Sequence, residues 1–169
     1  MNRLNWFKNF SRGYGVKILA LICGLVVGIS GFNFPAGANS GFVGDLSRQS
    51  LTEVQVSLGN FANELKFFPN HLEFEAGKRY KLVLKNPSNQ KHYFTAKDFA
   101  DVSWTQKVEV GKAEIKGAIH EVELKPGGEL EWVFVPIRPG NYQLYCSIPG
   151  HQEAGMTGEI LIQTSAIDT

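Results

Sequence analysis

One short window of the sequence holds three residues that are able to bind a soft metal ion. Cys146, His151 and Met156 stand at intervals of five residues, in a Cys-x4-His-x4-Met spacing. A thiolate, an imidazole and a thioether are donors that suit copper. A mononuclear copper centre that exchanges electrons takes two His, one Cys and a weak axial Met. The window therefore predicts one copper ion, bound on a turn between two strands, and a second His must come from elsewhere in the chain.

Three further histidines are available for this role. His92 follows a loop after the strand expected at 79–85, so it would lie at the end of a strand that can neighbour the Cys146 strand. His71 begins another expected strand, and His120 stands among alternating glutamates on a strand with a solvated pattern. We predict that His92 is the fourth ligand and that His71 and His120 are surface residues.

The elements that must position these ligands are short strands. Apolar and polar residues alternate with a period of two, and Gly and Pro turns separate the alternating runs. The runs lie at 53–58, 72–74, 79–85, 122–124, 130–134, 142–146 and 160–162. Seven or eight such strands predict an all-β, antiparallel sandwich that forms a single domain over 53–165. Residues 96–119 have the least clear pattern, with a helical turn expected near 98–103 and a hairpin at 107–116.

The first 38 residues have the composition of an export signal. Four basic residues and no acidic one occupy 1–17, an apolar run covers 16–29, and an Ala-x-Ala sequence precedes Asn39. This order predicts a cleaved signal peptide over 1–38 and a flexible leader over 39–52. The alternative is an uncleaved membrane anchor, although the apolar run is shorter than the ~20 residues of a membrane-spanning helix.

Composition and missing motifs exclude further classes of function. Without residues 1–38 the chain keeps 13 basic and 16 acidic residues and a single Cys, Cys146. Such a balance excludes a basic nucleic-acid-binding arm. The sequence contains no GxGxxG and no phosphate-binding GxxxxGK[ST] motif, so nucleotide chemistry is not expected. A lone Cys in an exported protein needs a reason, and a metal site supplies one.

The motifs resemble a known family. The stretch from Gly140 to Gly158, with Tyr142, Tyr145, Cys146, Pro149-Gly150-His151 and Ala154-Gly155-Met156, closely resembles the blue-copper cupredoxins of the plastocyanin/azurin family. Phe68-Pro69, Gly77, Asn86 and His92 are similar to the upstream half of that family. The Cys-x4-His-x4-Met loop looks like those of the rusticyanin and auracyanin branches. One departure is Tyr93, because this family often has Asn after its first His ligand.

The resemblance implies a Greek-key sandwich and a type 1 copper centre with the ligands His92, Cys146, His151 and axial Met156. It also implies a small electron carrier rather than an enzyme, monomeric, which meets a redox donor and acceptor transiently in a periplasm or thylakoid lumen. The alternative function is copper handling, in which the protein delivers copper to another protein. A fragment of a multicopper oxidase would need a second domain and further His ligands. We expect contact with a membrane only if the N-terminal segment stays uncleaved.

Overall fold

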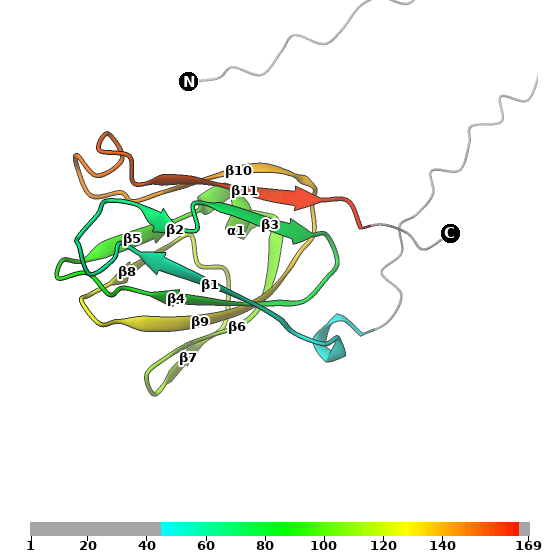
Figure 1. The fold of residues 1–169 in the computed structure, drawn as a ribbon. Coiled ribbons are helices and arrows are strands. Elements are labelled where there is room, and N and C mark those ends of the chain that lie inside the picture. The colour runs from blue at the N-terminus through cyan, green and yellow to red at the C-terminus, as the bar shows by residue number, and fades with distance from the viewer. Residues whose placement is uncertain (1–44, 166–169) are drawn as a thin grey trace, which may run out of the picture. The chain divides into compact units, whose positions relative to one another are not determined.

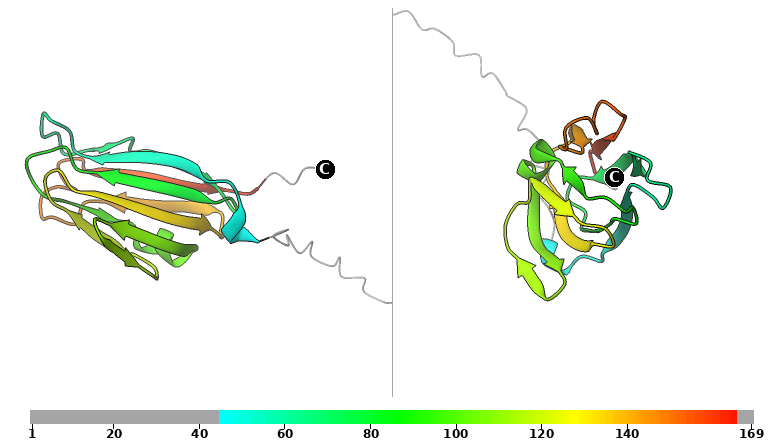
Figure 2. Two further views of the ribbon diagram at one scale, coloured as in Figure 1. Left: turned by 90° about the horizontal axis from the view of Figure 1, so that it is seen from below. Right: turned by 90° about the vertical axis from the view of Figure 1, so that its left-hand side faces the viewer.

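The segments in which apolar and polar residues alternate form the strands of two facing sheets (Figures 1 and 2). The computed structural model describes residues 45–165, so the predicted signal peptide at 1–38 lies outside the described residues. The elements in chain order are the 3-10 helix η1 (Leu46–Arg48), β1 (Thr52–Leu58), β2 (Phe67–Phe68), β3 (His71–Glu75), β4 (Tyr80–Lys85), β5 (His92–Thr95), α1 (Lys97–Asp101), β6 (Ser103–Val110), β7 (Ala113–Ile115), β8 (Glu121–Leu124), β9 (Glu129–Pro136), β10 (Gly140–Tyr145) and β11 (Thr157–Gln163).

The two sheets confirm the predicted all-β Greek-key sandwich. One sheet has the order β2-β1-β4-β9-β6-β7 and the other has the order β3-β11-β10-β5-β8. Most neighbouring strands are antiparallel, but β1 pairs with β4 and β3 pairs with β11 in parallel. Alternation alone does not reveal these two parallel pairs, because it shows which residues face inward and not which strands are neighbours.

The core between the sheets is rich in aromatic side chains. Phe134 lies at its centre, with ring centroids at 5.1 Å from Trp132, 5.3 Å from Phe74 and 5.3 Å from Phe99. All four side chains are at most 2% exposed. Because aromatic residues bury large apolar areas, this cluster contributes much of the stability of the sandwich.

Residues 96–119 are ordered parts of the domain. The short helix α1 places Phe99 in the core, and β6 pairs with β9 before it turns into β7. The helical turn and the hairpin expected here are both present. At the other end of the domain, η1 lies within the expected 39–52 leader, and β1 already begins at Thr52.

The loops around the predicted ligands gather at one end of the sandwich. Figure 1 shows the loops 59–66, 86–91, 125–128 and 147–156 at the left-hand end, and the right-hand view of Figure 2 looks onto that end. The described chain starts and finishes at the opposite end, near η1 and the end of β11. No helix within 45–165 is both long and apolar enough to span a membrane.

Candidate metal centre

His92 is the first residue of β5 and is completely buried. Neither of its ring nitrogens, Nδ1 or Nε2, has a hydrogen-bond partner among the described residues. A buried imidazole without partners costs free energy, because both polar atoms have lost their water. Two unpaired nitrogens on a buried ring suit a histidine that binds a metal ion.

Cys146 and Met156 lie at the two ends of the loop that joins β10 to β11, and both are completely buried. The Cys146 N–H donates to the Met156 carbonyl at 3.1 Å, and the Met156 N–H donates to the His151 carbonyl at 2.9 Å. Two glycines with left-handed backbone conformations, Gly150 (φ +87°) and Gly155 (φ +100°), allow the tight turns between them. The main chain therefore fixes the relative positions of Cys146, His151 and Met156.

The structure brings His92, Cys146 and His151 together. Their candidate donor atoms all lie within 4.8 Å of one another. The Cys146 Sγ is 3.4 Å from the His151 Nδ1, and the two imidazole rings have centroids 5.2 Å apart. His92 and Cys146 are 54 positions apart in the sequence, and Cys146 and His151 are 5 positions apart. The fold therefore brings all three side chains to one place.

Burial also sets the protonation state of His92. Desolvation, followed by repulsion from His151, lowers the pKa of His92 to about 4. The ring is therefore neutral at pH 7, which is the form that binds a metal ion. His151 is only half-buried, so it is the one histidine of the site that reaches the surface.

Tyr93 contributes through its backbone. Its N–H donates to the Cys146 Sγ at 3.3 Å. A hydrogen bond to the sulfur stabilises the thiolate form that binds metals. Because the donor is the main-chain N–H, Tyr93 makes this contact without the Asn side chain that the family resemblance leads us to expect.

Two supporting residues could not be recognised as such from the sequence. The buried Asn86 side chain donates to the carbonyls of Gln90 and Leu124, both at 2.8 Å, and so ties the loop before His92 to β8. Gly59 (φ +77°) passes so close to the site that an added Cβ would lie 3.1 Å from His92 Nε2. The family resemblance includes Asn86 without indicating these bonds, and nothing in the sequence around Gly59 indicates its approach to His92.

The remaining histidines lie apart from this group. The side chains of His71 and His120 are each 48% exposed and pair with Glu73 at 3.0 Å and with Asp101 at 2.6 Å. Tyr145, the last residue of β10, is half-buried and directly precedes Cys146 in the sequence. The structure thus places His71 and His120 on the surface, as predicted.

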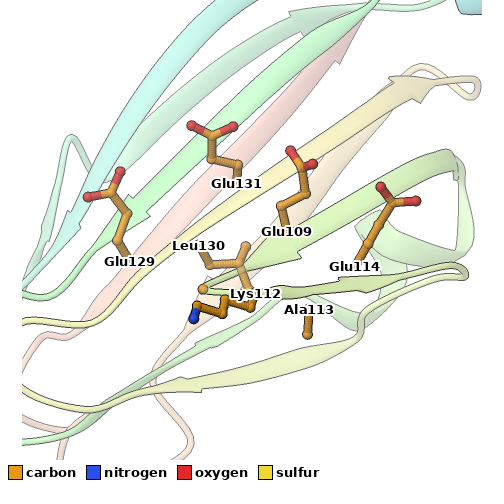
Figure 3. Close-up of a pocket in the computed structure, with 8 residues that line it drawn as sticks. Glu109, Lys112, Ala113, Glu114, Glu129, Leu130 and Glu131 are labelled. Atoms are coloured by element: carbon orange, nitrogen blue, oxygen red, sulfur yellow. The ribbon is translucent and has the colours of Figure 1, made fainter.

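A separate hollow lies over β6, β7 and β9 (Figure 3). Glu109, Glu114, Glu129 and Glu131 line it, together with Lys112. Each of the four carboxylates pairs with a lysine, at 2.9 Å for Lys107–Glu109, 3.4 Å for Lys85–Glu129 and 3.6 Å for Lys81–Glu131, and through Lys116 for Glu114. Two of these pairs join β4 to β9, one lies along β6 and one lies at the end of β7, so the hollow is lined by surface ion pairs.

The site fits copper. It offers a buried cysteine sulfur, two imidazoles of which one is orphaned and neutral, and a buried thioether on the same loop. Soft sulfur donors combined with imidazole select copper over hard ions such as Mg²⁺ or Ca²⁺. Copper bound there would be held away from water by the surrounding buried side chains.

Comparison with known proteins points to the same metal. Residues 54–163 match the copper binding proteins of the plastocyanin/azurin family. The copper-resistant cuproprotein CopI of Pseudomonas aeruginosa is 24% identical, over 85% of this chain and 93% of CopI. Auracyanin A, a "blue" copper protein of Chloroflexus aurantiacus, is 19% identical with a TM-score of 0.48, and the match covers 68% of this chain and all of auracyanin A. The reduced auracyanin of Roseiflexus castenholzii is 19% identical with a TM-score of 0.47, over 68% of this chain and 98% of that one.

Proposed function

The chain belongs to the plastocyanin/azurin family of copper binding proteins, and on that premise we propose that it is an exported electron carrier with one copper ion. His92, Cys146, His151 and Met156 would hold the ion, with the thioether of Met156 as the weakest ligand. Copper held there would supply one-electron exchange between Cu(I) and Cu(II). We assign no catalytic reaction to the protein, which instead meets a redox donor and a redox acceptor in turn.

The observation that carries this proposal is that the fold itself holds the donors together. Three donor atoms lie within 4.8 Å of one another, and main-chain hydrogen bonds hold the loop that carries two of them. A site whose ligands are fixed by the main chain resists rearrangement when the charge of its metal changes. Small rearrangement favours fast electron transfer, whereas a site that must release its metal needs ligands that can open.

The half-buried His151 is the proposed point of electron entry and exit. Its loop exposes the uncharged residues Pro149, Gly150, Ala154 and Gly155, and Glu153 is the one charged residue that the loop exposes. The loop 59–66 passes His92 at Gly59, lies at the same end of the sandwich (Figure 1) and carries Phe61, which is 89% exposed. Uncharged surface is desolvated at little cost, so a partner can approach the His151 ring closely there. Interfaces of transient redox complexes are small, so one such patch suffices.

Charge placed on this patch tests the proposal. We expect Pro149→Glu and Ala154→Lys each to slow electron self-exchange between oxidised and reduced protein at least several-fold, because a charged rim keeps the two copies hydrated and apart. NMR line broadening in mixtures of the two redox states measures the rate. Absorption spectrum and reduction potential should stay at their wild-type values.

Gln143→Glu is the matched control, since it adds the same charge as Pro149→Glu on an exposed position of β10. Its self-exchange rate should match that of the wild type. The alternative entry point is Tyr145, the half-buried residue directly before Cys146 in the sequence. If both loop variants exchange electrons at the wild-type rate while Tyr145→Leu slows the exchange, electrons enter through Tyr145 and our assignment to His151 fails.

Copper handling is the second candidate function, because CopI, a relative of similar length, is named a copper-resistant cuproprotein. The two functions differ in how firmly copper is held. An electron carrier should retain Cu(I) for hours against an excess of a Cu(I) chelator such as bathocuproine disulfonate. Loss of copper within the time of mixing would favour delivery.

Export rests on the sequence of residues 1–38 alone, through their basic start, apolar run and Ala-x-Ala ending. We propose a location beyond the inner membrane, in a periplasm or a thylakoid lumen. N-terminal sequencing of the protein purified from its own cells should give a start near Asn39. An intact Met1 would instead support the anchored form.

A further inference from the structure

One carboxylate on β8 holds both sequence neighbours of His92. The Glu123 Oε2 accepts a hydrogen bond from the Tyr93 hydroxyl and lies 3.0 Å from the Lys91 Nζ. The Lys91 Nζ also lies 5.5 Å from the centroid of the Tyr93 ring. Lys91, Tyr93 and Glu123 therefore form a closed cluster, which we call the β8 clamp, around the backbone of the buried histidine.

The register of the sheet places the residues of the β8 clamp directly opposite one another. Tyr93 pairs with Glu123 and His92 pairs with Leu124 across the antiparallel β5–β8 ladder. Directly opposed side chains in such a ladder are close neighbours, so the hydroxyl and the carboxylate meet without spanning a gap. The hydrogen bond from the Tyr93 hydroxyl, followed by that from Lys91, holds the pKa of Glu123 below its usual value, which keeps the carboxylate ionised.

On the side of β5 that faces β10, the residues near His92 form few ladder pairs with the neighbouring strand. The ladder between β5 and β10 contains the single pair Thr95–Tyr145, at the far end of β5 from His92. Beside His92, the link towards the β10 side is the bond from the Tyr93 N–H to the Cys146 Sγ. The position of the Tyr93 backbone thus decides the geometry at the sulfur.

The His92 ring has no hydrogen bond of its own to hold it. In metal sites the second ring nitrogen of a histidine ligand usually donates to a protein group, which fixes the direction of the ring. Among the described residues no such group reaches His92 Nδ1 or Nε2. Apart from a bond to the metal, packing and the path of the backbone therefore set the direction of the ring.

We propose that Glu123 is a positioning residue of the copper centre. By holding Lys91 and Tyr93 it fixes the backbone on both sides of His92, and it thereby sets both the His92 ring and the hydrogen bond to the Cys146 sulfur. This role rests on the proposed copper site. In other metal sites a hydrogen bond to the ring of the histidine ligand fixes its direction, and here the β8 clamp does so through the backbone.

The neighbouring Glu121 provides a matched control. It lies on the same strand, and its Oε2 accepts a hydrogen bond at 2.9 Å from the hydroxyl of Thr95, its register partner on β5. Glu121→Ala and Glu123→Ala therefore each remove one carboxylate that binds one hydroxyl across the same ladder. Only Glu123→Ala releases the neighbours of His92.

Hydrogen exchange in the copper-free protein gives the first readout. We expect Glu123→Ala to speed exchange of the Tyr93 amide about tenfold, because a hydrogen bond to a charged group is lost and β5 opens locally. Glu121→Ala should leave the Tyr93 amide within twofold of the wild type. Glu123→Gln should fall between the two, since its amide oxygen can still accept from Tyr93 but does not attract Lys91 as an ion.

The copper-loaded protein gives the second readout. Glu123→Ala and Tyr93→Phe should both change the relative intensities of the visible thiolate bands and shift the reduction potential, while Glu121→Ala should change neither. Tyr93→Phe removes a single oxygen atom, so it tests the clamp even if Glu123→Ala fails to fold.

Equal effects of Glu121→Ala and Glu123→Ala on the Tyr93 amide and on the spectrum would make Glu123 an ordinary strand-stabilising residue and would overturn the inference. A failure of the proposed function looks different. In that case the wild type would show no thiolate band with copper, while the comparison of amide exchange in the copper-free variants would still report on the clamp.

Discussion

Replacing Cys146 with serine should abolish the intense visible absorption of the copper-loaded protein. In our account this absorption arises from charge transfer between a thiolate and copper, and Cys146 is the one free cysteine among residues 45–165. A serine hydroxyl is a hard, weak donor that cannot replace the soft thiolate. Absorption spectra recorded together with the copper content of each sample measure the effect.

The exposed histidines supply the controls for this experiment. His71→Ala and His120→Ala should leave the spectrum nearly unchanged, since both side chains lie on the surface and pair with carboxylates. His92→Ala should change the spectrum strongly, because the buried ring would be lost from the site. A visible band that survives in Cys146→Ser, or one that disappears in His71→Ala or His120→Ala, would contradict the ligand assignment.

The second large effect concerns stability. Phe134→Ala should lower the free energy of unfolding of the copper-free protein by about 3–5 kcal/mol. The Phe134 side chain is fully buried, and its ring packs against those of Phe74, Phe99 and Trp132, so its loss leaves a cavity between the two sheets. Urea denaturation followed by tryptophan fluorescence measures this change.

Phe61→Ala is the matched control, because it removes the same side chain from a position that is 89% exposed. Its unfolding free energy should stay within ~0.5 kcal/mol of the wild type, as is usual for surface substitutions. A loss for Phe134→Ala as small as that for Phe61→Ala would mean that the aromatic cluster is not the centre of the core. The same Phe61 variant should still bind copper.

Much of the fold could be predicted because burial follows the strand period. The alternation at 79–85, 130–134 and 142–146 predicts β4, β9 and β10, and the structure has strands at those places. The parallel β1–β4 and β3–β11 pairs could not be predicted in this way. Alternation reports the side of a sheet on which a residue lies, and the choice of neighbour depends on contacts between distant segments.

The same division applies to the metal centre. Cys146, His151 and Met156 could be predicted together because ligands of unusual chemistry stand close together in the sequence. His92 was predicted from its loop and from the need for a partner, and the structure places it beside Cys146 and His151. Glu123 gave no signal, since its connection to Tyr93 depends on a register between residues 30 positions apart.

The most direct test of the central claim is a crystal structure of the copper-loaded protein, with anomalous diffraction recorded on both sides of the copper absorption edge. Our account predicts a single strong anomalous peak among His92, Cys146 and His151, with bonds of about 2.0–2.3 Å to the two imidazoles and the thiolate and a longer contact to the Met156 sulfur. A copper peak at His71 or His120, or one near Cys146 without a bond to its sulfur, would contradict it.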